Sequence, residues 1–389
     1  MSGGFRLDFC NVRGLRANFF AVYAHLHSHH PSLLALSETQ VCEDADPLDF
    51  YVPGYHLLPA FSSHRGIALY IRSDIAFKVQ QSRVTDRMFN TPWVKLNISG
   101  HVFHFGFVYR SPNLDRAATY FNMDALSDDI SSFLENCPNS EVVVAGDFNI
   151  HNASWLRHSS HTTPEGQYVE LFAESNNLTQ LVKEPTHIPC VDGHSQNILD
   201  LFMTSHPEKY DVKLLAPLGN SDHHTISTSF SYTSLRTVSA PAPKRIVWQY
   251  EKANWSELNR FFLCFNWKLC FLDRNITSAA KMVEEIILLG MRSFIPSKNV
   301  SIKPKDHSWF NATCRDAVRS KEEAFRNWRF NKNAHTDDVR KQVRNRCNAI
   351  LRRQKFLHEQ ALRRKVLNTS KGSKNFWSFV KRVKNQTAS

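Results

Sequence analysis

Short apolar runs alternate with amphipathic segments along the first 230 residues of the chain. The apolar runs are rich in β-branched and aromatic residues and are bounded by turn formers, which predicts strands at residues 5–12, 32–40, 66–75, 93–99, 101–110, 141–148, 198–205 and 223–232. Apolar residues at helical spacing predict helices at 14–30, 115–136 and 165–176. We expect the strands from 66 to 110 to be antiparallel neighbours. This order predicts a four-layered α/β sandwich, in which two packed, mostly antiparallel sheets carry helices on the outside.

The pattern changes after a Pro- and Ala-rich stretch, "TVSAPAPKR". We therefore place a domain at residues 1–232, a linker at 233–245, and a helical region at 246–389. Within that last region, residues 317–333 and 337–367 are free of proline and predict two long helices.

The positive charge of the chain is concentrated in its last fifth. Residues 310–389 contain 21 Lys or Arg against 6 Asp or Glu, whereas residues 1–309 contain 27 against 30. A charge run is usually a solvated helix face, but clusters such as "LRRQK" with interleaved aromatic residues could also contact a phosphate backbone. The C-terminal region is therefore predicted to be helical and basic, with nucleic acid as its candidate partner.

Several of the predicted strands end in polar residues that do not suit a buried sheet. They are Asn11, Glu38, Tyr109 with Arg110, Asp147 with Asn149, Asp200, and Asp222 with His223 before the last strand. A cap, a turn or a satisfied buried polar group explains any one of them. Six such positions together favour one polar site at the edge of the sandwich, where ligands of layered α/β proteins bind.

Seven motifs, in this order, carry a family resemblance: "NVRGLR", "SETQ", "VYRSPN", "GDFNIHNASW", "PTH", "ILDLF" and "SDHH". "GDFN" alone is moderately specific, and the ordered set is strong. Residues 5 to about 230 thereby resemble the endonuclease/exonuclease/phosphatase family with the deoxyribonuclease I-like fold. The details are similar to its branch in non-LTR retrotransposons, where the nuclease precedes a reverse transcriptase.

The resemblance implies a phosphodiester hydrolase that depends on Mg²⁺, with Mn²⁺ as the alternative. Hard oxygen ligands suit Mg²⁺, and the family pattern assigns the metal environment to Glu38, Asn11 and Asp222. It implies that Asp147 orients or deprotonates the attacking water, and that Asn149 and Asn11 contact the phosphate.

The same pattern assigns the remaining roles around the phosphate. His223 would stabilise the pentavalent phosphate, and Asp200 would fix the tautomer and orientation of its ring. Tyr109 would donate to the phosphate or lie beside the leaving group. Arg110, Thr186 and Ser221 are expected to line the substrate, although turn capping also explains the two hydroxyls.

We therefore predict a retrotransposon-type endonuclease that nicks DNA and leaves a 3′ hydroxyl to prime reverse transcription. The alternatives are an inactive or domesticated nucleic-acid-binding remnant and a phosphatase of the same fold. The abasic-site repair enzymes of the family have an acid where this sequence has Arg13, which argues against dedicated repair. The substrate is DNA, and RNA is a second candidate partner of the basic region.

Other features limit the class and location of the protein. Eight cysteines without a CxxC pair and the lack of a secretory pattern predict a reduced, intracellular protein, acting on DNA in the nucleus or located in the cytoplasm. The apolar stretch at 261–272 is short and contains Asn266 and Lys268, so no membrane span is expected. No aromatic-x-Asp-Asp pair has the strand context of a polymerase. The histidines of "HLHSHH" are expected at a solvated helix end rather than at a metal site.

Overall fold

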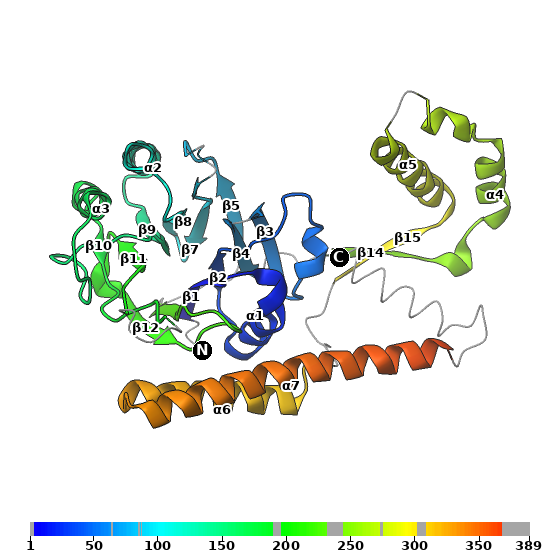
Figure 1. Ribbon diagram of the computed structural model, residues 1–389. Helices are drawn as coiled ribbons and strands as arrows, with labels where there is room; N and C mark the ends of the chain where they lie inside the picture. The colour runs from blue at the N-terminus through cyan, green and yellow to red at the C-terminus, as the bar shows by residue number, and fades with distance from the viewer. Residues whose placement is uncertain are drawn as a thin grey trace. The chain divides into compact units, whose positions relative to one another are not determined.

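The computed structural model describes most of the chain, and Figure 1 shows its helices and strands as ribbons. The described residues are 4–63, 65–84, 86, 88–189, 196–231, 244–272, 275–301 and 309–367. They form two compact units, one built from residues 1–240 and 304–389 and the other from 241–303. Most of the predicted linker, as well as residues 368–389, lies outside the described residues.

The first sheet of the larger unit has six strands within the described residues. Their order is β12 (Asp211–Leu215), β13 (Thr225–Ser231), β1 (Gly4–Asn11), β2 (Leu33–Ser37), β4 (Arg65–Arg72) and β3 (Tyr55–Ser62). The pair β1–β2 is parallel, and the other neighbours are antiparallel.

The second sheet has seven strands within the same described residues. Its order is β10 (Thr179–Gln180), β11 (Asp200–Thr204), β9 (Glu141–Asp147), β8 (His101–Arg110), β7 (Trp93–Ile98) and β5 (Phe77–Gln80), with β6 (Phe89–Asn90) paired to β8. Only β8–β9 is parallel among these described pairs.

The strand β2 is buried on both faces, which explains its uninterrupted apolar sequence. Leu33 and Ala35 point into the core between the sheets, whereas Leu34 and Leu36 point outward to helix α1 (Leu15–His29). Because side chains alternate along a strand, this register lets one short segment join two layers.

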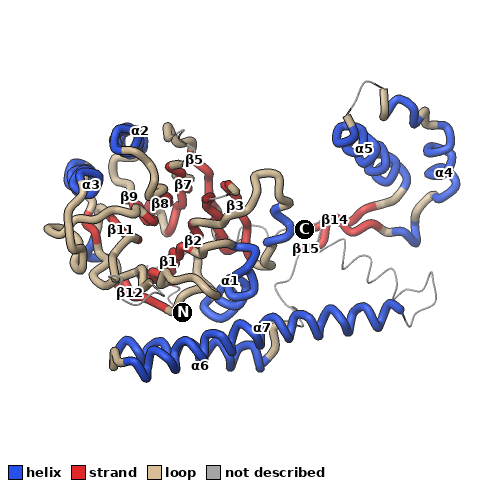
Figure 2. Tube along the Cα trace, in the orientation of Figure 1, coloured by secondary structure: helices blue, strands red, loops and turns tan. Residues whose placement is uncertain are grey.

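Helices cover the outer face of each sheet (Figure 2). Helix α1 covers the first sheet, and helices α2 (Arg116–Asn136) and α3 (Pro164–Ser175) pack on the second. Asp115 caps α2 by accepting a hydrogen bond from the Ala118 amide, and Thr163 caps α3 in the same way. The predicted four-layered α/β sandwich is confirmed.

The predicted strand neighbours are correct in part. Strands β7 and β8 pair in antiparallel fashion as expected. Strand β4 instead lies in the other sheet, between β2 and β3. The sequence pattern predicts that each segment is a strand. Which sheet the strand joins depends on the path of residues 73–92, which connect β4 in one sheet to β7 in the other.

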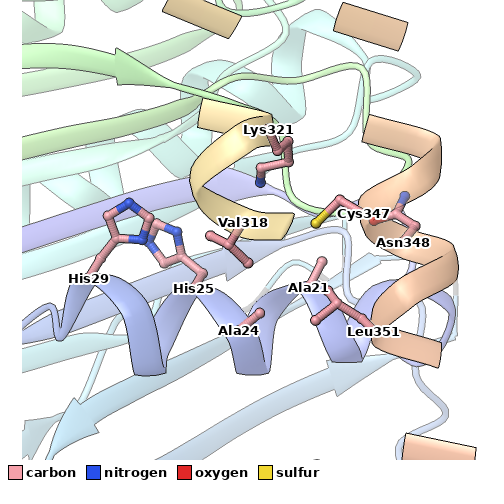
Figure 3. A pocket seen from close by; sticks show the side chains of 9 residues that line it. All are labelled: Ala21, Ala24, His25, His29, Val318, Lys321, Cys347, Asn348 and Leu351. Carbon is pink, nitrogen blue, oxygen red and sulfur yellow. The ribbon is translucent and has the colours of Figure 1, made fainter. Parts of the chain in front are cut away.

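Two helices of the C-terminal region pack against the sandwich. Helix α6 (Ala312–Phe330) and helix α7 (Ala334–Leu367) form a hairpin, and both contact α1. Figure 3 shows the small pocket at this junction, with Ala21 and Ala24 of α1 facing Val318 of α6 and Leu351 of α7. The alanines allow the close approach of the three helices. The prediction of two long helices here is confirmed.

The smaller unit combines helices with a two-stranded sheet. Strands β14 (Lys244–Trp248) and β15 (Ser297–Ser301) pair in antiparallel fashion, and helices α4 (Trp255–Cys264) and α5 (Ile276–Phe294) pack on each other. The strands were not predicted. Among the described helices, none is long and apolar enough to cross a bilayer.

Candidate active site

Three of the predicted residues lie side by side at the ends of three neighbouring strands of the second sheet. Asp147 at the end of β9 is directly opposite Tyr109 of β8 on one side and Asp200 of β11 on the other. Gly146 precedes Asp147, and a Cβ at this glycine would lie 2.1 Å from the Val108 carbonyl oxygen. Only glycine permits this close pairing, so Gly146 is required by the backbone that presents Asp147.

The first sheet contributes Asn11 to the same place. Asn11 ends β1 and its Nδ2 donates a hydrogen bond of 2.8 Å to Asp147 Oδ2, with both residues fully buried. Burial raises the pKa of Asp147 well above its ordinary value, and the neighbouring Asp200 carboxylate raises it further. A carboxylate with a raised pKa is a stronger base, which is the property needed to accept a proton from water.

His223 is held by Asp200 in the arrangement expected of an oriented catalytic histidine. His223 Nδ1 is 2.7 Å from Asp200 Oδ2, and its Nε2 is 4.0 Å from Asp222 Oδ1. Burial lowers the pKa of His223, but the Asp200 carboxylate outweighs it and raises the value to about 9. The ring therefore carries a positive charge at neutral pH and can stabilise negative charge on a phosphate.

Asp222 is surrounded by cationic or hydrogen-bonding groups. Its Oδ2 is ion-paired with Arg13 Nη1 and lies 3.3 Å from His187 Nε2. Burial raises the pKa of Asp222, but the hydrogen bond from His187 and the charges of His223 and Arg13 lower it to about 2. The carboxylate is therefore ionised at any physiological pH.

Glu38 follows β2 in a left-handed backbone conformation with φ of 48°. Its backbone is fixed because its carbonyl accepts a hydrogen bond of 2.8 Å from the Gly14 amide. Burial raises the pKa of Tyr109, and the carboxylates of Glu38 and Asp147 raise it further. Glu38 therefore lies within electrostatic reach of both Tyr109 and Asp147, and its side chain is half-buried.

The two predicted hydroxyls make hydrogen bonds to the backbone around the site. Ser221 Oγ donates to the Asn11 carbonyl at 2.6 Å and accepts from the His223 amide at 3.1 Å. Thr186 Oγ1 accepts from the Asp200 amide at 3.0 Å. These contacts hold the backbone of Asn11, His223 and Asp200 in place, and the predicted contact of either hydroxyl with substrate stays a prediction.

Arg110 lies next to Tyr109 but directs its guanidinium into the protein. The side chain is buried and donates to Thr119 Oγ1 at 3.0 Å and to the Asn149 carbonyl at 3.1 Å. Asn149 Nδ2 returns a bond of 3.0 Å to the Arg110 carbonyl. Arg110 thus shapes the turn that presents Asn149, and its predicted contact with substrate stays a prediction.

His187 is a member of the site that the sequence analysis missed. Its backbone forms an isolated bridge with His223, and the two rings lie 4.8 Å apart. The signal was available, because His187 directly follows Thr186 in the "PTH" motif. His187 reaches the site through its backbone bridge with His223, which lies 36 positions later in the chain. The sequence alone does not show this pairing.

The residues present fit a hard divalent cation. Within the described residues, two groups could hold an ion: Asp147, Asp200 and His223, and His187, Asp222 and His223. Oδ1 of Asp200 and Oδ1 of Asp222 are both buried and have no hydrogen-bond partner in the described part of the chain. Buried carboxylate oxygens need a partner, and Mg²⁺ prefers such oxygen ligands. Glu38, predicted as a metal ligand, belongs to neither group, and its charge contributes to the raised pKa of Asp147.

The histidines of "HLHSHH" are in part buried, and the expected solvated helix end is wrong for His25. Its side chain is buried, and its Nε2 lies 2.7 Å from Asp8 Oδ2. Burial lowers the pKa of His27 to about 4 and that of His29 to about 3. The pairing of His25 with β1, together with the packing of α6 and α7 around His25 and His29, explains the difference.

Comparison with known protein families tests the resemblance that the sequence motifs suggest. Residues 103–227 match the family described as "Endonuclease-reverse transcriptase". The resemblance to the endonuclease/exonuclease/phosphatase nucleases of retrotransposons is confirmed. The matched segment contains most of the predicted site residues, namely Tyr109, Arg110, Asp147, Asn149, Thr186, Asp200, Ser221, Asp222 and His223. This family match indicates a nuclease of the phosphodiesterase type.

Solved structures similar to this chain include the following three. The endonuclease domain of TRAS1, a telomere-specific non-LTR retrotransposon, is 13% identical, covers 59% of this chain and 98% of its own, and has a TM-score of 0.46. The 3′-5′ exonuclease NExo from Neisseria meningitidis is 18% identical, with coverages of 59% and 100% and a TM-score of 0.45. The APE2 catalytic domain from Xenopus laevis is 16% identical, with coverages of 60% and 95% and a TM-score of 0.48. None of the curated proteins matches the chain.

Proposed function

We propose that the chain is a Mg²⁺-dependent endonuclease that nicks one strand of DNA and leaves a 3′ hydroxyl for reverse transcription. The observation that carries the proposal is a pair of buried hydrogen bonds at neighbouring strand ends. Asn11 donates to Asp147, and His223 is hydrogen-bonded to Asp200, which lies opposite Asp147. Four segments far apart in sequence meet in these contacts. A purely structural role would not require charged groups to be buried together with unpaired oxygens.

The metal environment in this proposal consists of Glu38, Asn11 and Asp222, with Mn²⁺ as an alternative to Mg²⁺. A bound cation would supply charge neutralisation at the scissile phosphate. The hydrogen bond from His187 and the charge of His223 keep Asp222 ionised, whereas Arg13 occupies one of its oxygens.

The remaining residues act on water and phosphate in this proposal. Asp147 accepts the proton of the attacking water, and Asn149 on the adjacent turn holds the phosphate. His223, kept cationic by Asp200, stabilises the charge that develops on the phosphate oxygens. Tyr109 keeps its proton because its pKa is raised, so it can donate to the phosphate or to the departing 3′ oxygen.

A supercoiled plasmid tests this function. The full chain should convert it to open circles with Mg²⁺ and not with EDTA, and a DNA polymerase should extend the nicks because they end in a 3′ hydroxyl. Glu38→Ala should nick at least about 10²-fold more slowly.

Two other outcomes would replace the proposal. Plasmid binding without nicking would favour an inactive or domesticated nucleic-acid-binding protein. Release of phosphate from small phosphate esters, with no nicking, would favour a phosphatase.

A further inference from the structure

Two aromatic residues of the C-terminal hairpin contact the loops of the candidate active site. Phe325 and Trp328 of α6 form a small buried cluster with Ala216, against which Ile188 packs. The His224 ring lies 4.8 Å from the Phe325 ring and 5.8 Å from the Trp328 ring. His224 directly follows His223, and Ile188 directly follows His187, so each contact is one residue away from the site.

Polar groups of α6 hold the backbone of the loop that leads to Asp222. Lys321 Nζ donates to the Pro217 carbonyl at 3.2 Å, and Arg329 Nη1 donates to the Leu214 carbonyl at 2.9 Å. Buried carbonyls need donors, and these two lie in the loop at Pro217 and in the edge strand β12 at Leu214. The segment at 214–224, which contains the end of β12 and the loop to β13, therefore takes part of its backbone hydrogen bonding from a helix about 100 residues later in the chain.

The second loop, at 184–188, is tied to the first and to the same helix. The His224 amide donates to the Thr186 carbonyl at 2.7 Å, and the Ile188 amide donates to the Asp222 carbonyl at 3.0 Å. Arg329 also pairs with Glu184. Both loops and α6 thus form one connected set of contacts.

A different part of the hairpin packs elsewhere. Val318 of α6 faces Ala24 of α1 in the junction pocket (Figure 3). Trp309 and Phe310 also pack on α1, where the Trp309 ring lies 4.7 Å from the Tyr23 ring. The hairpin is therefore anchored at α1 by one set of residues, while Phe325 and Trp328 reach the loops.

We propose that α6 is a positioning element of the nuclease site, and that Phe325 and Trp328 are its positioning residues. They fix the loops that carry His187, Asp222 and His223 without touching substrate. This inference rests on the proposed function. Small displacements of catalytic groups lower the rate of the chemical step by about 10- to 100-fold, with less effect on substrate binding. Loss of the aromatic contact should therefore lower kcat for nicking more than it changes KM.

The test uses the full chain with Phe325→Ala, Trp328→Ala, the conservative Trp328→Phe, and the matched control Val318→Ala. Val318 is buried in the same helix but packs on α1, so its truncation perturbs the hairpin without removing a loop contact. Two readouts are compared, the kcat and KM of plasmid nicking and the hydrogen–deuterium exchange of peptides covering 184–189 and 214–224. Thermal unfolding of each variant establishes that it is folded at the assay temperature.

Phe325→Ala and Trp328→Ala should lower kcat by about 10- to 100-fold, change KM by less than about 3-fold, and accelerate exchange in the two loops. Val318→Ala should leave kcat and loop exchange near wild type, and Trp328→Phe should restore most of the rate. Unchanged loop exchange in folded Phe325→Ala and Trp328→Ala would overturn the inference, as would equal effects in Val318→Ala. If the wild-type chain does not nick DNA, the proposed function fails, and the exchange comparison still decides whether α6 orders the loops.

Discussion

Asn11 Nδ2 lies 2.8 Å from Asp147 Oδ2, and this hydrogen bond links the end of a strand in one sheet to the end of a strand in the other. The site therefore forms only when the two sheets pack in their native register. Carboxylates and a histidine that are distant in sequence become neighbours through the packing of the core beneath them.

Asn11→Ala tests this link. The change removes the donor to a buried carboxylate, so we expect nicking to fall by about 10²- to 10³-fold and stability to fall by about 1–3 kcal/mol. Single-turnover nicking and urea unfolding measure the two effects. Wild-type nicking by the variant would contradict the role of Asn11.

Asp200→Asn tests the orientation of His223. The amide keeps the shape of the carboxylate but cannot hold a cationic ring, so the histidine loses its charge and its fixed tautomer. The nicking rate should fall by about 10²- to 10⁴-fold while DNA binding changes little. A comparable loss of DNA affinity would point instead to a general disturbance of the site.

Arg13→Ala tests the ion pair with Asp222. Arg13 is half-exposed and competes with a cation for the Asp222 carboxylate. Its removal should lower the Mg²⁺ concentration that gives half-maximal nicking. A titration of Mg²⁺ at constant ionic strength measures the shift, and Arg16→Ala is a control because Arg16 pairs with the exposed Asp49 instead. A higher Mg²⁺ requirement in Arg13→Ala would contradict this view of Asp222.

The buried pair of Asp8 and His25 predicts a pH dependence of stability away from the site. Burial raises the pKa of Asp8, but His25 and Arg6 lower it to about 2 from an ordinary 3.8. The folded state therefore favours the ionised carboxylate, which contributes about 2 kcal/mol above about pH 4 and loses it as the pH falls toward 2. The free energies of unfolding of wild type and Asp8→Asn, measured in urea, should differ more at about pH 6 than at about pH 3. An equal difference at both values would show that Asp8 does not titrate in this way.

Much of the fold could be predicted from the sequence, because strands buried on both faces leave a plain signal. The apolar run of β2 and the valines of β9 are examples. The sheet in which β4 lies could not be predicted, because pairing depends on chain paths rather than on local pattern. The histidines of α1 were misjudged for a related reason, since His25 pairs with Asp8 of β1, and His25 and His29 line the pocket formed with α6 and α7.

The candidate site was partly visible because polar residues at the ends of buried strands are costly without a purpose. Asp147 and Asp200 gave this signal. The α6 residues Phe325 and Trp328 gave none, and the position of His187 in the "PTH" motif did not show that it lies beside His223. Their contribution to the site depends on tertiary packing.

The rate of Mg²⁺-dependent plasmid nicking by wild type, His223→Ala and His101→Ala tests the central claim most directly. His101 is the exposed first residue of β8, whereas Tyr109 is near the last residue of the same strand. Its replacement therefore controls for the loss of a histidine away from the site. We predict that His223→Ala nicks about 10²- to 10⁴-fold more slowly than wild type and that His101→Ala nicks at the wild-type rate. Equal nicking by all three proteins would contradict the assignment of this site.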